Sequence, residues 1–443
     1  MSRVAGRPTP LGAAAPATPR EPGAAGGRDW LVDLARIASV AVVVAMHWLF
    51  LKVTVVDGVM RTDPALSGPV VLALTWVLMV LPLFLLAAGF AATRVADRNR
   101  AAGTGYTAYL GPRLLRVVSP VLVLVAVTTT VVLLVGAVDP GSARRLTAVA
   151  GNHLWFLAVY LLCLVVAPAA VAVHDRWGWW VLPALLLGGS LLVDLAWFSG
   201  AVGYEPARWA NLVLVWLFCH QLGVLHARGT LASCPPAVPV LVLLAVVTTL
   251  VVMVVAGPYA AANIGMADQP TSNLTPPNAA LALVGVAQLG VLTLLARALG
   301  DRVPGPRVRA AVRWLNPRLV LVYLWHVPAL GAVTFVGLLA PEVLLPAGTG
   351  AWLALRPLYL VLALVLLWLV LVPAGAWELR VHRWRVSTRP AAVLPSAGLA
   401  VAGTALAWHW GIGPAPMPLV ALALLLAAVA LLVRPAGVPG AEG

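Results

Sequence analysis

Long apolar runs recur along the whole chain and are separated by short polar or basic segments. Each run holds about 20 mostly hydrophobic residues, the length that a helix needs to cross a lipid bilayer. Twelve runs of this kind are predicted as membrane spans, at residues 31–51, 70–92, 117–137, 153–173, 179–199, 209–227, 238–257, 279–299, 319–339, 352–374, 391–409 and 416–433. The pattern therefore predicts an all-α, polytopic transmembrane helix bundle.

The composition agrees with a membrane protein. Of the 443 residues, 62% are hydrophobic and only 10% are charged, whereas soluble domains carry about 25% charged residues. The three cysteines, Cys163, Cys219 and Cys234, show no paired spacing, so the sequence supports neither a disulfide framework nor a metal site. An ordinary water-soluble domain is excluded by this composition.

The net charge of +14 is distributed unevenly. Of the 29 Lys and Arg residues, 22 lie in segments on the same predicted side as the N-terminus, six lie in the other loops, and Arg36 lies inside the first span. Basic residues are enriched on the cytoplasmic side of membrane proteins. We therefore expect a cytoplasmic N-terminus in a plasma (inner) membrane. We expect no nucleic-acid partner, because the basic residues are accounted for by the orientation of the spans.

The first span contains three ionisable residues, Asp33, Arg36 and His47. A central Asp or Arg costs roughly 2.5–3.5 kcal/mol to insert, so such residues usually face a protein or water-lined interior. At about 100° per residue, the eleven steps from Arg36 to His47 return to within about 20° of the same direction, and Asp33 joins this face. In the alternative interpretation, Asp33 and Arg36 neutralise each other at the inner end, while His47 anchors the outer end beside Trp48.

Further polar residues recur at the ends of later spans. Arg113 and Arg116 lie on one face at the predicted start of a helix, where they are suited to phosphate groups or are ordinary flanking charges. His153 and Trp155 open the fourth span at its outer end, and an aromatic belt would account for Trp155. In the sixth span, His220 needs a partner, and it bridges helices or binds a ligand.

The ninth span contains Tyr323-Leu-Trp-His326-Val-Pro328. Tyr323 and His326 are three residues apart and share a helical face. Pro328 weakens the local backbone bonding and opens the helix around His326. We expect this group in the cytoplasmic half of the span.

Four motifs occur in order over roughly residues 29–375. They are Arg36-x10-His47, Arg113-x-x-Arg116, His-Leu-Trp-Phe-Leu from His153, and Tyr-Leu-Trp-His-x-Pro from Tyr323. Together they resemble the integral-membrane acyltransferase type 3 family, whose members O-acylate cell-surface sugars and lipids in bacteria. Residues 1–29 are rich in Ala, Gly, Pro and Arg, and this composition predicts a disordered cytoplasmic tail. Many members of the family have about ten core spans, so the resemblance implies an acyltransferase type 3-like transmembrane domain at 30–375 and a C-terminal pair of spans with a tail at 376–443.

The resemblance also implies an activity, namely transfer of an acyl group, most simply acetyl, from acetyl-coenzyme A to a hydroxyl of a glycan or glycolipid. The acyl-coenzyme A is a donor substrate, and no tightly bound cofactor is expected. His47 would act as a general base or be acylated itself, and Arg36, paired with Asp33, would stabilise the donor's charge or the thioester oxyanion. The remaining implied roles are coenzyme A contacts for Arg113 and Arg116, and acceptor binding for His153, Trp155, His220, Tyr323 and His326.

Two rival functions are consistent with the pattern of spans. A transporter or flippase of a lipid-linked sugar or acyl compound would also have many spans and charged residues near the midplane. Against it, the two halves of the chain show no evident internal repeat, and the buried charges concentrate in the first span. A purely structural subunit would leave the cost of burying Arg36 and His47 unexplained.

Overall fold

The computed structural model of the chain describes residues 29–56, 59–201, 205–269, 271–300, 302–346 and 348–433. The tail predicted to be disordered lies outside the described residues, except for Asp29. The side chain of Asp29 accepts a hydrogen bond from the Val32 backbone N–H at 3.0 Å and caps the first helix. Such a cap satisfies one of the free N–H groups at a helix start.

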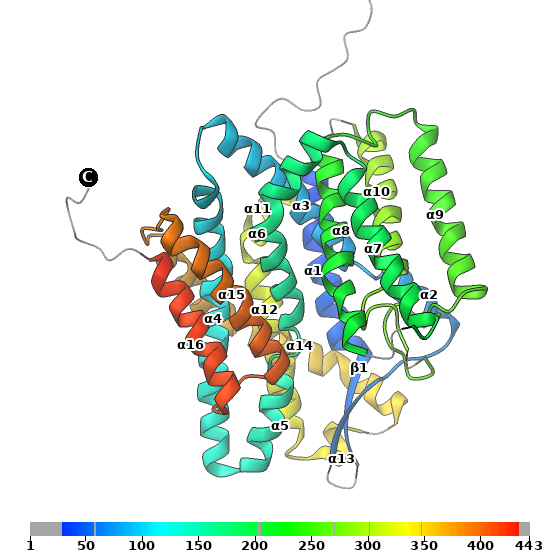
Figure 1. Cartoon of the computed structure of the whole chain (residues 1–443). Coiled ribbons are helices and arrows are strands. Elements are labelled where there is room, and N and C mark those ends of the chain that lie inside the picture. The colour runs from blue at the N-terminus through cyan, green and yellow to red at the C-terminus, as the bar shows by residue number, and fades with distance from the viewer. Residues whose placement is uncertain are drawn as a thin grey trace, which may run out of the picture.

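The described residues form a bundle of long apolar helices (Figure 1). Eleven helical segments are long and apolar enough to cross a membrane, and one shorter apolar helix follows them. The all-helical membrane bundle predicted from the sequence is therefore confirmed. The long helices are α1 (Trp30–Phe50), α3 (Leu81–Ala101), α4 (Tyr106–Val138), α6 (Leu154–Trp177), α7 (Val181–Phe198), α8 (Ala210–Ala227), α9 (Ala237–Val255), α10 (Ala279–Leu299), α12 (Leu319–Gly337), α14 (Thr349–Val381), α15 (Pro390–Trp410) and α16 (Pro416–Leu432).

Shorter elements connect these helices. They are α2 (Pro69–Val77), α5 (Pro140–Ala150), α11 (Pro306–Leu315), α13 (Pro341–Leu344), and the 3-10 turns η1 (Glu205–Trp209) and η2 (Asn316–Arg318). A two-stranded antiparallel hairpin, β1 (Leu51–Val56) and β2 (Val59–Pro64), follows α1. The span prediction gave no hairpin here, although the β-branched residues of the segment favour a strand.

The predicted span 70–92 lies within one candidate membrane span, Pro69–Ala101, and the helix is interrupted inside it. It consists of α2 and α3, which are separated at Leu78 to Val80. Pro82 lies at the start of α3, where its missing N–H has no helical partner to lose, whereas within a continuous helix it would remove a backbone bond. In contrast, α4 begins eleven residues before the predicted position, so Arg113 and Arg116 lie inside a helix.

Close contact between α3 and α8 fixes the centre of the bundle. A Cβ atom added to Gly89 would lie 1.9 Å from the backbone oxygen of His220, and one added to Gly223 would lie 1.9 Å from that of Leu86. Small residues allow membrane helices to approach at such distances. Helix α1 packs against α3 and α12, and the α15–α16 pair covers α4 and α6.

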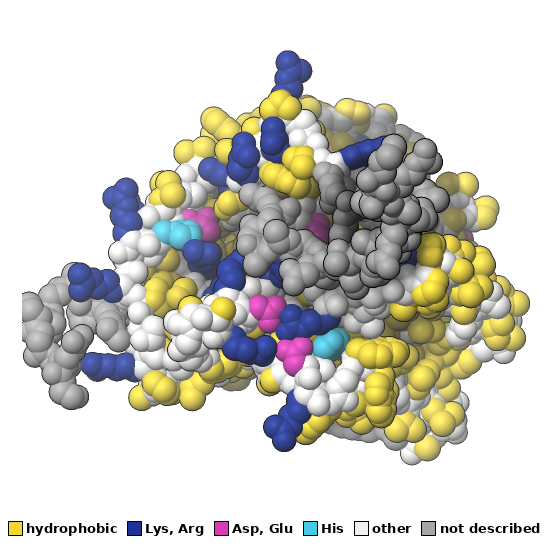
Figure 2. All heavy atoms as spheres, turned by 90° about the horizontal axis from the view of Figure 1, so that it is seen from above, with side chains coloured by type: hydrophobic (Ala, Val, Ile, Leu, Met, Phe, Trp, Pro, Cys, Tyr) yellow, Lys and Arg dark blue, Asp and Glu magenta, His cyan; other side chains and the backbone are white. Residues whose placement is uncertain are grey.

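One end of the bundle, which we call the basic face, carries basic side chains across its surface (Figure 2). It contains the start of α1 and the ends of α3, α6, α8, α10 and α14. There the Arg228 guanidinium donates hydrogen bonds to Asp97 at 2.7 and 2.9 Å and to Asp175 at 2.9 Å, which raises the pKa of Arg228, with Asp97 contributing most. This network joins the ends of α3, α6 and α8.

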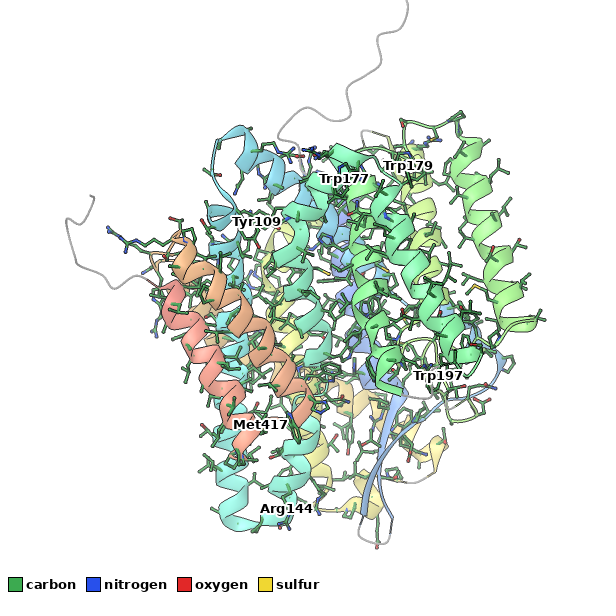
Figure 3. All side chains as sticks on the ribbon, viewed as in Figure 1. Tyr109, Arg144, Trp177, Trp179, Trp197 and Met417 are labelled. Atoms are coloured by element: carbon green, nitrogen blue, oxygen red, sulfur yellow. The ribbon has the colours of Figure 1, made fainter. Side chains whose placement is uncertain are left out.

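Tryptophans mark both ends of the helices (Figure 3). Trp177 and Trp179 lie at the basic face, and Trp197 lies toward the opposite face. Trp177 and Trp179 are exposed, as expected for side chains at the level of the lipid headgroups. The bundle therefore has the two interfaces that a membrane protein requires.

Candidate active site

Three histidines from distant parts of the chain meet inside the bundle, and we call them the histidine cluster: His47 on α1, His153 directly before α6, and His326 on α12. The ring centroids of His47 and His326 are 4.9 Å apart, and those of His153 and His326 are 5.9 Å apart. His153 and His326 are buried, and His47 is partly buried. The sequence singled out all three residues, and the fold brings them together.

Pro328 leaves free the backbone oxygen that the His153 ring contacts. Because proline has no N–H, the carbonyl of Leu324, four residues earlier on α12, lacks its usual helical donor. The ring Nε2 of His153 lies 3.1 Å from this oxygen, and the Tyr323 hydroxyl donates to the backbone oxygen of His153 at 2.6 Å. The predicted effect of Pro328 is thus visible as a side-chain hydrogen bond that replaces a backbone one.

His326 is held by two further contacts. Its Nδ1 lies 2.5 Å from the backbone oxygen of Tyr323, and the Trp48 indole N–H donates to the His326 backbone oxygen at 3.0 Å. A carbonyl oxygen can only accept, so in the neutral ring the proton of His326 is on Nδ1. This leaves His326 Nε2 as an acceptor directed at His47.

The same reasoning assigns the tautomer of His47. Its Nδ1 lies 2.8 Å from the Val43 backbone oxygen and 3.3 Å from Nε2 of His326. Both partners are acceptors, so neutral His47 carries its proton on Nδ1, and its Nε2 has a free lone pair. An imidazole in this state can accept a proton at Nε2 while Nδ1 remains anchored, which is the arrangement of a general base.

Replacing Pro328 with alanine should lower activity without lowering stability. The new N–H would donate to the Leu324 carbonyl, complete the helix and displace His153 from that oxygen. A displaced group near the chemistry costs about tenfold to a hundredfold in rate, whereas the free energy of unfolding should stay the same or rise. Acyl-transfer rates and thermal unfolding of P328A would test this, with P168A in α6 as the control for loss of a helix-interior proline.

An aromatic wall adjoins the cluster, formed by Trp155, Phe156, Trp216 and Tyr323. The Phe156 ring lies 5.6 Å from Tyr323, and Trp155 lies 5.8 Å from Trp216. Trp155 was selected from the sequence, whereas Trp216 and Trp48 were missed. The position of Trp48 directly after His47 was the signal for it, because an indole N–H inside a membrane needs an acceptor.

Asp33 and Arg36 lie near the other end of α1. Arg36 is eleven residues from His47, which is roughly 16 Å along a helix. Both side chains are half-buried, and in the described part of the chain neither of them contacts the histidine cluster. Their pairing and their catalytic role stay predictions.

Arg113 and Arg116 lie on α4 near the basic face. Arg113 is half-buried, its guanidinium stacks 4.7 Å from the Tyr109 ring, and its Nη1 donates to the Tyr109 backbone oxygen at 2.6 Å. Figure 3 places Tyr109 in the part of α4 nearest the basic face. Arg116 lies one turn further along α4, and Arg98 lies in the last turn of α3; we call these three arginines the basic cluster. Repulsion among like charges favours an anion there.

His220 is buried on α8, away from the histidine cluster. Its backbone oxygen contacts Gly89, and the neighbouring Gln221 pairs with Nδ1 of His174 at 3.2 Å. Gln221 therefore bridges α8 and α6. A ligand-binding role for His220 stays a prediction.

An apolar cavity of about 920 Å³ lies between α1, α2, α9 and α10. On α1 it is lined by Leu31, Leu34, Ala35 and Ala38. None of the predicted site residues is among its described lining. The described residues also contain no group of three or more His, Cys, Asp or Glu side chains arranged to hold a metal ion. The histidine cluster is therefore the candidate centre for chemistry.

Comparison with known proteins identifies the family of the chain. The model of an acyltransferase domain, that of the acyltransferase 3 family, matches residues 30–372, well over half of the chain. No curated protein and no solved structure matches the chain. The matched residues include the whole histidine cluster and the basic cluster, whereas α15 and α16 lie beyond them. The chain therefore belongs to the acyltransferase 3 family of membrane proteins.

Proposed function

We propose that this protein moves an acyl group, most simply acetyl, from acyl-coenzyme A at the basic face to a hydroxyl of a cell-surface glycan or glycolipid at the opposite face. The single observation that carries the proposal is the free Nε2 of His47, whose Nδ1 is held by Val43 and His326. The uneven distribution of arginines supports a cytoplasmic basic face in a bacterial plasma membrane.

The proposed reaction uses His47 as the base. Its Nε2 takes the proton of the acceptor hydroxyl while the oxygen attacks the thioester carbonyl carbon. The tetrahedral intermediate then loses the coenzyme A thiolate, which receives the proton from the His47 imidazolium. During this cycle the positive charge on His47 is stabilised by the Val43 carbonyl and by Nε2 of His326.

Arg36 fits one of its two proposed roles better. At roughly 16 Å along α1 from His47, its guanidinium is too far to stabilise an oxyanion formed at His47. We therefore assign Arg36 to the charge of the donor, between the basic cluster and the histidine cluster. The long flexible arm of the donor would follow this face of α1 to reach His47.

Arg113 should contribute to donor binding. We expect Arg113→Ala to raise the KM for acyl-coenzyme A about tenfold, because a charge-assisted hydrogen bond to phosphate is lost, and to change kcat little. Steady-state kinetics with varied donor would measure this. Arg307→Ala removes an exposed arginine of the basic face and serves as the control; equal effects of the two variants would contradict a specific donor contact.

One assay tests the proposal as a whole. Purified protein is incubated with radiolabelled acetyl-coenzyme A and a glycan or glycolipid acceptor, and labelled acceptor is measured for the native chain and for His47→Ala. Labelled acceptor that disappears in the variant supports the enzyme. Vesicle uptake or export of the acceptor without any label transfer would instead support the transporter or flippase.

A further inference from the structure

A buried arginine that has no carboxylate partner among the described residues lies toward the opposite face of the bundle. Arg356, on α14, is only 7% exposed. Within the described residues its guanidinium meets no carboxylate, and its one hydrogen bond runs from Nε to the Trp352 backbone oxygen at 3.4 Å. The two terminal nitrogens of the guanidinium thus have no acceptor among the described residues. A buried charge is unfavourable unless it is paired.

Two aromatic rings hold this guanidinium in place. It lies 4.4 Å from the centroid of Trp352 and 4.4 Å from that of Tyr359, one turn away on either side along α14. The Tyr359 hydroxyl donates to the Leu344 backbone oxygen at 2.6 Å. A side chain at Gly337 would meet this hydroxyl, because an added Cβ would lie 2.7 Å from it. The cation is therefore oriented before any ligand binds.

A second donor next to Arg356 also lacks a partner. The indole N–H of Trp352 is fully buried and has no acceptor among the described residues. Nearly all buried donors in proteins are hydrogen-bonded, so an unsatisfied one indicates an unoccupied acceptor position. A guanidinium and an indole N–H at one place form a donor set for the oxygens of a phosphate or carboxylate.

Arg208 provides a comparison on the same side of the bundle. Its guanidinium also stacks on a tryptophan, 4.3 Å from the Trp197 ring. However, Arg208 is only half-buried and lies in the field of the Asp194 carboxylate. Arg356 therefore differs from an ordinary interfacial arginine in its low exposure and in having no carboxylate partner among the described residues.

We propose that Arg356 and Trp352 bind an anionic group, a phosphate or a carboxylate, of the acceptor molecule. This inference rests on the proposed function, since it assigns the acceptor to the opposite face. Gly337, which adjoins Tyr359, is eleven residues beyond His326 on α12, or roughly 16 Å along the helix. Arg356 and the histidine cluster are thus separated along α12 by about that distance, so an acceptor that reaches both would be larger than a single sugar ring.

Binding can be measured without turnover. The full chain carrying His47→Ala is placed in nanodiscs of phosphatidylcholine and titrated with inorganic phosphate, glucose 1-phosphate or neutral glucose, and thermal unfolding and the Kd are measured. We expect the two phosphates to raise the unfolding temperature and glucose to have no effect. Using His47→Ala separates this test from the catalytic proposal, because binding should persist even where transfer is absent.

Matched variants test the residues. Arg356→Gln should weaken phosphate binding at least tenfold, Arg356→Lys should retain part of it as a point charge, and Trp352→Phe, which keeps the stacking ring and removes the N–H, should weaken binding a few-fold. Arg208→Gln should leave the Kd unchanged. Unaltered phosphate binding in Arg356→Gln, or an equal response to glucose, would overturn the proposal.

A second titration distinguishes a lipid headgroup from a soluble or glycan-borne source of the anion. The titration is repeated with phosphatidylglycerol added to the nanodiscs. Unchanged binding of glucose 1-phosphate supports a soluble or glycan-borne anion. Complete competition by phosphatidylglycerol that Arg356→Gln abolishes would overturn the acceptor assignment and give the site to a lipid headgroup.

Discussion

Replacing His47 with alanine should lower the rate of acyl transfer by about a hundredfold to ten-thousandfold, the usual contribution of a general base. The hydroxyl of the acceptor would lose the group proposed to take its proton, and the carbonyl of Val43 and Nε2 of His326 would lose their donor. Because His47 is only partly buried, the bundle should still fold. The rate is measured with radiolabelled acetyl-coenzyme A and the acceptor.

A matched control for this variant is His409→Ala, which removes an exposed histidine at the end of α15. It should leave transfer unchanged. Transfer by His47→Ala at the native rate, with a native thermal unfolding temperature, would remove His47 from the chemistry and with it the proposed mechanism.

The two roles left open for His47 differ in one observable. If His47 is acylated during the reaction, labelled acetyl-coenzyme A without acceptor should leave label on the protein, and His47→Ala should abolish that label. As a general base, His47 carries no covalent acyl group, and the protein stays unlabelled until acceptor is added. The geometry serves both, since either role needs the free Nε2.

Much of the fold could be predicted because membrane spans follow from local sequence. An apolar run of about 20 residues forms a helix wherever the backbone must satisfy its own hydrogen bonds in lipid. The span predicted at 279–299 coincides with α10, and most other boundaries agree within a few residues. The break before α3 and the β1–β2 hairpin were not predicted. A proline near a helix start and a short outer strand do not change the run of apolar residues from which the spans were predicted.

The site was predicted as separate residues, and their assembly was not. His47, His153 and His326 are far apart in sequence, and no local pattern reports a contact between helices. The depth of His326 was also wrong, since it lies level with His47 near the end of α1 and not in the cytoplasmic half. The structure places α11 and η2, which pack against α1, directly before α12, and a hydropathy pattern does not report how such short elements shift the depth of a span.

The last prediction concerns the contact between α3 and α8. We expect Gly89→Ala to destabilise the bundle by more than about 3 kcal/mol, beyond the usual cost of overpacking. The added Cβ would lie 1.9 Å from the His220 backbone oxygen, and the opposing residue is Gly223, so no flexible side chain can move aside. The helices would have to separate. Thermal unfolding of the purified protein in detergent would measure the loss.

Gly188→Ala is the matched control, since it makes the same change inside α7, where an added Cβ meets nothing within 4 Å. Alanine favours a helix over glycine by about 1 kcal/mol, so this variant should be as stable as the native chain or slightly more so. If Gly89→Ala and Gly188→Ala unfolded at the same temperature, the α3–α8 contact would be looser than described. Because the basic cluster includes Arg98 at the far end of α3, a displaced α3 should also weaken donor binding in Gly89→Ala and leave it intact in Gly188→Ala.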